Sequence, residues 1–145
     1  MTAADIFLVD SNILVYYFDS AEPAKHKISK EIIDKCLDGK LKLAVSVQNL
    51  SEFFSVTTSK KILTKVDAIR TLSYFAEFSG IAKITFDHKT VVEAAAISEE
   101  YDMHYWDALL AATMKHNNIL NLYTENKKDF KIPWLNAVNP FEKTK

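Results

Sequence analysis

Short apolar runs alternate with longer stretches of helical periodicity along the chain. The apolar runs have the length of strands and lie at 6–9, 41–45, 81–86, 119–124 and 135–138. Apolar residues recur at helical spacing over 11–18, 23–38, 47–59, 64–79, 87–101 and 105–117. Strands that are separated by helices need crossover connections. The pattern therefore predicts an α/β fold, in which a mostly parallel central sheet of four to five strands has helices on both faces.

The helical spacing also predicts which side chains face the core. Over 64–79, the predicted inward positions are Val66, Ile69, Leu72, Phe75 and Ala76. Over 105–117, one apolar stripe holds Trp106, Leu109, Leu110, Thr113 and Met114.

Length and composition narrow the function classes. The 145 residues suit one domain, 1–145, and 48% of them are hydrophobic, which is enough for a sizeable core. Only two glycines occur, which excludes the glycine-rich phosphate loops of the common Rossmann and P-loop enzymes. The 18 basic and 19 acidic residues give a net charge of −1, so the bulk charge does not indicate a nucleic-acid binder. If the protein recognises phosphate, local lysines or a bound metal must do so.

The single cysteine, Cys36, excludes an intramolecular disulfide and favours a reducing cytoplasm. No apolar run approaches the ~20 residues that a membrane span needs, and the N-terminus lacks the pattern of a signal peptide. We therefore expect a cytoplasmic protein without a membrane partner.

Acidic residues recur where strands of the predicted sheet end. Asp10 follows the first strand, Glu52 lies on the helix after the second, and Asp107 opens the helix before 119–124. Glu125, Asn126 and Asp129 follow 119–124. Ligands of such sheets bind beyond the carboxyl ends of the strands. An all-oxygen set suits Mg²⁺ or Mn²⁺, and phosphodiester hydrolysis uses such metals to activate water and to neutralise charge.

Each of these acids also suits an ordinary structural role. Asp10 can cap a helix, and Asp107 in a first helical turn interacts favourably with the helix dipole. Glu52 can be a solvated helix residue and Asp129 an ordinary loop acid. No single acid is specific, so the functional interpretation depends on their combination.

In that combination the chain resembles the PIN-domain family, in particular the VapC-like toxin ribonucleases. The matching segments are FLVDSNILVYYF at 7–18, SVQNLSEFF at 46–54, YWDALLAAT at 105–113 and LYTENKKDF at 122–130. The resemblance implies a three-layer α/β/α fold, with metal ligands at Asp10, Glu52 and Asp107. It also implies that Asn12 orients the site and that Thr124 is the hydroxyl position near the first acid.

The fourth acidic position departs from the family pattern. Family members commonly carry an aspartate two residues after the hydroxyl position, where this chain has Asn126, flanked by Glu125 and Asp129. Asparagine offers a carbonyl oxygen but no charge. Whether Asn126 or Asp129 serves as the fourth position, and whether one or two metals bind, stays open from the sequence.

The resemblance further implies a homodimer, a small antitoxin that blocks the active site, and an RNA substrate. Lysines that could hold phosphates cluster at 60, 61 and 65, and at 115, 127, 128 and 131, although solvated helix surfaces also explain them. Tyr16, Tyr17 and Trp106 could stack on bases or pack in a core or dimer. The leading hypothesis is a Mg²⁺- or Mn²⁺-dependent endoribonuclease that acts as the toxin of a toxin–antitoxin pair. The alternative is a non-catalytic RNA-binding or protein-interaction module on a degenerate PIN fold.

Overall fold

The computed structural model describes residues 6–142, and five strands within them form one parallel sheet. The strands are β1 (Phe7–Val9), β2 (Leu43–Ser46), β3 (Ile81–Ile84), β4 (Asn121–Tyr123) and β5 (Asn136–Val138), in the order β3-β2-β1-β4-β5. Every neighbouring pair is parallel, and Leu8 of β1, for example, is in register with Ala44 and Leu122. The predicted mostly parallel sheet is confirmed.

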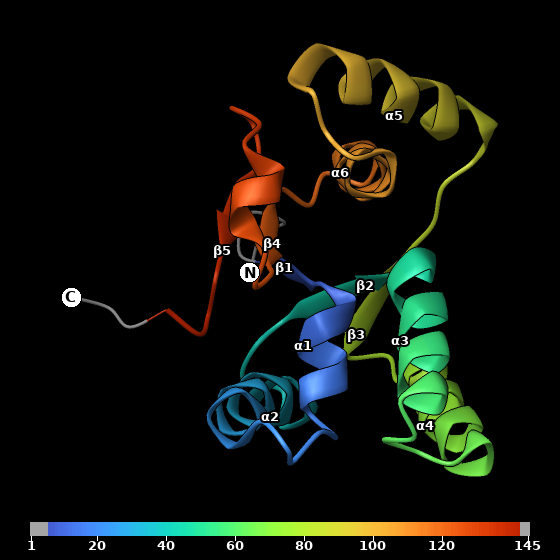
Figure 1. The fold of residues 1–145 in the computed structure, drawn as a ribbon, viewed down its shortest axis with the longest axis vertical. Coiled ribbons are helices and arrows are strands. Elements are labelled where there is room, and N and C mark those ends of the chain that lie inside the picture. The colour runs from blue at the N-terminus through green and yellow to red at the C-terminus, as the bar shows by residue number, and fades with distance from the viewer. Residues whose placement is uncertain (1–5, 143–145) are drawn as a thin grey trace.

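Helices cover both faces of this sheet and make three layers (Figure 1). One face carries α5 (His88–Tyr101) and α6 (Tyr105–His116). The other carries α1 (Ser11–Tyr16), α2 (Pro23–Leu37), α3 (Val47–Ser59) and α4 (Lys65–Glu77). A 3₁₀ helix, η2 (Lys127–Phe130), follows β4. None of the helices within residues 6–142 is both long and apolar enough to cross a membrane.

Two hydrophobic cores lie on the two faces of the sheet because successive strand side chains point in opposite directions. Leu8, Ala44 and Leu122 join the core under α5 and α6, and each is fully buried. Val9 and Val45, one residue along, join the core under α1–α4. Strands β1 and β2 are thus buried on both faces, as is usual for the inner strands of parallel sheets.

Helix α4 is rotated relative to the prediction. Val66 and Ile69 are 64% and 55% exposed and Ala76 is also exposed, so their predicted inward orientation is wrong. Phe75 sets the rotation, because its ring packs at 5.8 Å from that of Phe53. The inward face therefore runs through Ala68, Leu72 and Phe75.

Helix α6 lies between the sheet and α5, and most of its surface is buried (Figure 1). The predicted burial of Leu109, Leu110, Thr113 and Met114 is confirmed. Trp106 was expected on the same stripe, but its side chain is 59% exposed. It lies in the first turn, where α6 emerges at the carboxyl edge of the sheet.

The order of the strands places a switch point at β1. The chain moves from β1 to β2 on one side and later returns to β4 on the other side of β1. Crossovers on opposite sides leave a crevice at the carboxyl ends of the two central strands. Asp10 and Thr124, which directly follow β1 and β4, lie at this point.

Candidate active site

Asp10 is held firmly at the switch point. Its Oδ1 accepts a hydrogen bond from the Ser11 amide at 2.8 Å and its Oδ2 accepts one from the Thr124 hydroxyl at 2.8 Å. Asp10 therefore does cap α1, and it also directs its carboxylate into the crevice. Burial raises the pKa of this carboxyl and the negative charge of Glu125 adds to the rise, although the bonds from Thr124 and Ser11 oppose it.

Asn49 is a site residue that the sequence analysis did not identify. Its amide donates to Asp10 Oδ1 at 3.4 Å, while its own Oδ1 accepts bonds from the backbone and hydroxyl of Ser46. The Ser46 hydroxyl in turn accepts a hydrogen bond from the main-chain N–H of Asn49, and Ser46 thereby caps α3. A serine followed three residues later by an asparagine is a variant of the capping-box spacing, so the sequence did carry a signal for this contact.

Glu52 lies on α3, at the rim of the same crevice. The Ser11 hydroxyl, which follows Asp10, lies 3.5 Å from Glu52 Oε2. Partial burial raises the pKa of Glu52, and the negative charges of Asp10 and Asp107 raise it further. A hydrogen bond from Gln48, one helical turn earlier, has the opposite effect. These contacts place Glu52 close to the first acid.

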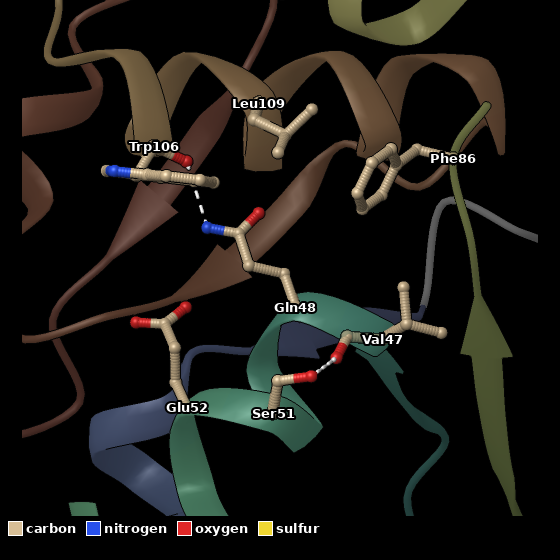
Figure 2. Close-up of a pocket in the computed structure, with 7 residues that line it drawn as sticks. All are labelled: Val47, Gln48, Ser51, Glu52, Phe86, Trp106 and Leu109. Carbon is tan, nitrogen blue, oxygen red and sulfur yellow. Dashed lines mark hydrogen bonds between the residues drawn. The ribbon is translucent and has the colours of Figure 1, made fainter. Parts of the chain in front are cut away.

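Asp107 enters from the other face of the sheet, in the first turn of α6. Burial raises its pKa, and the charges of Asp129 and Asp10 add to the rise. The start of α6 is tied to α3, because the Gln48 amide donates to the main-chain carbonyl of Trp106 at 3.1 Å (Figure 2). This bond joins the helix that carries Glu52 to the helix that carries Asp107.

The three acids thus come from three separate elements and influence one another's protonation. Asp10 raises the pKa of both Glu52 and Asp107, and Asp107 raises that of Glu52. Within residues 6–142, no set of three or more histidine, cysteine, aspartate or glutamate side chains is arranged as a ready ligand group for one ion. The acids are gathered and mutually repelling without forming a closed cage.

The donor chemistry of the crevice fits a divalent cation. All three acids offer hard oxygen ligands, and a cation between them would relieve the repulsion that raises their pKa values. Asn12, two residues after Asp10, has a buried Oδ1 with no hydrogen-bond partner among the described residues. Such an acceptor is costly unless a donor, a water or a cation meets it.

In the segment after β4, Asp129 lies beside the site acid Asp107, whereas the Asn126 side chain is exposed. Asn126 is exposed, and its amide donates to Thr124 Oγ1 at 3.1 Å, so it shapes the turn with its backbone. Asp129 lies near Asp107, and the two line one polar hollow of about 380 Å³ together with Lys128 and Lys131. Of the acids in this segment, Asp129 is therefore the one beside Asp107.

Glu125 has partners of its own. Its two carboxylate oxygens accept a hydrogen bond from the Tyr16 hydroxyl at 2.8 Å and pair with Lys25 at 3.0 Å. This network joins α1 and α2 to the loop after β4. The negative charge of Glu125 raises the pKa of Asp10, but both of its side-chain oxygens already bind Tyr16 or Lys25.

Comparisons with known proteins bear on the family. The PIN domain model matches residues 7–133. A toxin–antitoxin complex from Klebsiella pneumoniae is 23% identical, with a TM-score of 0.66 over 94% of this chain and 98% of that one. VapBC2 from Rickettsia felis, bound to a promoter DNA fragment, is 22% identical, with a TM-score of 0.66 over 92% and 98%. VapC20 from Mycobacterium tuberculosis, a toxin that cleaves the sarcin–ricin loop, is 14% identical, with a TM-score of 0.67 over 90% and 98%.

A search of the curated proteins finds no match to this chain. At these identities the solved structures share the fold, and they confirm the three-layer PIN-like architecture that the sequence motifs imply. The family model covers most of the chain, including every strand except β5 and all four acids of the candidate site. The chain therefore belongs to the PIN domain family.

Proposed function

We propose that this protein is a divalent-metal-dependent endoribonuclease. The observation that carries the proposal is that Asp10, Glu52 and Asp107 come from three elements to one edge of the sheet, where the charge of Asp10 raises the pKa of the other two. Unpaired carboxylates that lie close together repel one another, and this repulsion lowers the stability of the fold. A protein retains such an arrangement at a functional site more readily than in its general framework.

In this proposal the three acids hold Mg²⁺ or Mn²⁺, and Asp129 is the fourth acidic position beside Asp107. When bound, the cation supplies Lewis-acid activation of water and neutralises charge that develops on the phosphate. Thr124 and Asn49 fix the Asp10 carboxylate by direct hydrogen bonds, and Asn12, two residues after Asp10, has a buried Oδ1 that lacks a partner among the described residues. Asn126, which is exposed, contributes through its backbone.

An RNA substrate is supported by the charges beside the acids. Lys128 and Lys131 line the hollow that contains Asp107 and Asp129, and no ion pair within residues 6–142 involves either lysine. They are placed to receive the phosphates of a bound strand. Two other lysines of the same predicted cluster are less suited, since Lys127 pairs with Glu142 and Lys115 pairs with Glu93.

We further propose that the protein is the toxin of a toxin–antitoxin pair in the cytoplasm, a homodimer that a small antitoxin blocks. Its structural relatives include a toxin–antitoxin complex and a toxin that cleaves the sarcin–ricin loop. The buried free thiol of Cys36 suits a reducing compartment. Growth arrest on induction, relieved by a small protein encoded beside this chain, supports the toxin role. Cleavage without growth arrest favours RNA processing.

The test of the enzymatic proposal is cleavage of a cellular RNA preparation by the purified chain with Mg²⁺, Mn²⁺ or EDTA. Cleavage is expected with either metal and not with EDTA. Asp10→Asn is expected to lower the cleavage rate by at least about 100-fold, since it removes one proposed ligand charge. It keeps an oxygen for the Ser11 amide, so the fold should survive, and circular dichroism checks this.

The second candidate is a non-catalytic RNA-binding or protein-interaction module. The observation in its favour is that the acids within residues 6–142 do not form a ready ligand group and that Asn126 stands where the family commonly has an aspartate. Tight RNA binding without cleavage, together with no calorimetric response to either metal, supports this module and contradicts the enzyme.

A further inference from the structure

Beside Glu52, the surface is hollowed between α3 and α6. The hollow measures about 520 Å³, within the range of small-ligand sites. Figure 2 shows that Glu52 and Gln48 point toward it from α3, while Trp106 and Leu109 approach from α6. Val47, Ser51 and Phe86 complete the lining. Because Glu52 belongs to both, this hollow adjoins the acid crevice.

Trp106 is the unusual side chain of this hollow. Its 59% exposure is the largest of any tryptophan, tyrosine or phenylalanine among the exposed large hydrophobics of residues 6–142. Its neighbour Tyr105 packs edge-on against it at 5.2 Å, and the Gln48 bond holds the Trp106 backbone in place. An anchored residue that leaves its indole ring uncovered can present a flat surface to a planar ligand.

Gln48 adds a polar group to a largely apolar lining. Its amide is engaged with Trp106, but its Oε1 is buried without a hydrogen-bond partner among the described residues. A buried acceptor without a donor costs stability, and a ligand that brings an N–H group would remove this cost. The hollow thus offers an aromatic surface, an amide acceptor and a carboxylate at its rim.

We propose that this hollow binds one unpaired nucleobase of the RNA substrate, stacked on Trp106, in the nucleotide next to the phosphate that is cut. The inference rests on the proposed ribonuclease function. A base supplies a planar face for the indole ring and N–H groups for acceptors, and its phosphate lies toward the acids. Stacking of single-stranded bases on exposed aromatic rings is a general mode of RNA recognition.

A protein side chain fits this hollow less well. An apolar residue of a second protein or a second copy would cover the Glu52 carboxylate without bringing a cation or an N–H donor, which is unfavourable. A nucleotide avoids this cost, because a cation held at Glu52 would also neutralise the charge of its phosphate.

The hollow lined by Lys128 and Lys131, together with the Trp106 hollow, defines a path for the bound strand across the surface. Asp107 lines the hollow that contains Lys128 and Lys131, and Trp106, its neighbour in the chain, lines the first hollow. We therefore assign base contacts to the first and contacts with the sugar–phosphate backbone to the second. Replacement of Trp106 should weaken binding only of strands that carry bases. Replacement of the lysines should weaken binding of any strand.

The experiment uses the full chain carrying Asp10→Asn to prevent cleavage, and Trp134→Phe so that Trp106 is its one tryptophan. Single-stranded RNA of mixed sequence is expected to quench the Trp106 fluorescence, whereas an abasic ribose-phosphate strand of equal length is not. Equal quenching by both strands, or quenching by neither, overturns the proposal. Because this measurement needs no cleavage, it stays decisive if the wild-type protein cuts no RNA.

A matched series of variants measures affinity by anisotropy of a labelled RNA. Trp106→Ala is expected to weaken binding by about 5- to 100-fold, the range for one stacked base, while Trp106→Phe retains most of the affinity. Leu120→Ala, at an exposed apolar position without a ring, is the control and should change nothing. Unchanged RNA affinity in Trp106→Ala, with a shift from dimer to monomer in sedimentation, would instead make this face an interface between copies and refute base binding. If the wild type cleaves RNA and Trp106→Ala cleaves it with the same KM, base binding is refuted and the ribonuclease proposal stands.

Discussion

The side-chain amide of Gln48 donates to the main-chain carbonyl of Trp106 at 3.1 Å, and thereby ties together the two helices that carry Glu52 and Asp107. The Gln48 side chain also lowers the pKa of the Glu52 carboxyl, which lies one helical turn further along α3. One side chain therefore sets both the spacing of two acids and the charge of one of them. It touches no proposed reacting atom, so we regard it as a positioning residue.

Gln48→Ala should weaken Mg²⁺ and Mn²⁺ binding by about 2- to 10-fold, the loss expected for one hydrogen bond. Loss of the Gln48 side chain allows the pKa of Glu52 to rise further. The loss of metal affinity should therefore be greater at pH 6 than at pH 8. Titration calorimetry at the two pH values measures this. Ser51→Ala is the matched control, since its hydroxyl bonds only its own helix at the Val47 carbonyl. Equal affinities in Gln48→Ala and the wild type would refute the positioning role.

Asp10 makes the metal-free protein sensitive to pH. The folded state raises the pKa of this carboxyl, so folding favours its protonated form. Its contribution to stability is therefore complete below the unfolded pKa, about 4, and is lost as the pH rises through the higher folded value. Asp10→Asn removes this ionisation, and in EDTA it should unfold at a higher temperature than the wild type at pH 7.5.

The advantage of Asp10→Asn should shrink as the pH is lowered toward 4, where the wild-type carboxyl is protonated. Mg²⁺ should raise the melting temperature of the wild type at pH 7.5 and not that of Asp10→Asn. Differential scanning calorimetry with and without the metal measures both effects. Equal stabilisation of the two proteins by Mg²⁺ would show that the ion binds elsewhere.

The fourth acidic position is testable by exchange of charge. Asp129→Asn should lower metal-dependent cleavage by about 10-fold, because its charge acts directly on Asp107. Asn126→Ala should leave the rate within about 2-fold, since the contacts of Asn126 with Thr124 and Asp129 are made by its backbone. Initial rates on one RNA at saturating Mg²⁺ give the comparison. The opposite ranking would assign the fourth position to Asn126.

The sequence predicted the sheet and the position of Asp10 because both depend on local order along the chain. Each strand is a short apolar run, and an acid directly after such a run lies at the carboxyl edge wherever the strands are parallel. The contacts of Asn49 with Asp10 and of Gln48 with Trp106 join residues 39 and 58 positions apart. The first contact depends on how α3 packs beside the end of β1, and the second on how α3 and α6 lie on opposite faces of the sheet. No periodicity within one helix encodes either.

The rotation of α4 illustrates the same limit and yields a direct test. Helical spacing placed Val66 and Ile69 inward, but the ring of Phe75 fits between those of Phe53 and Phe18 and fixes the helix one face away. Phe75→Ala should therefore lower the free energy of unfolding by about 3–5 kcal/mol, the usual range for a buried phenylalanine. Val66→Ala, which is exposed, should change it by less than about 0.5 kcal/mol. Urea denaturation followed by circular dichroism measures both variants. A loss in Val66→Ala as large as that in Phe75→Ala would return α4 to the orientation that its hydrophobic spacing alone predicts.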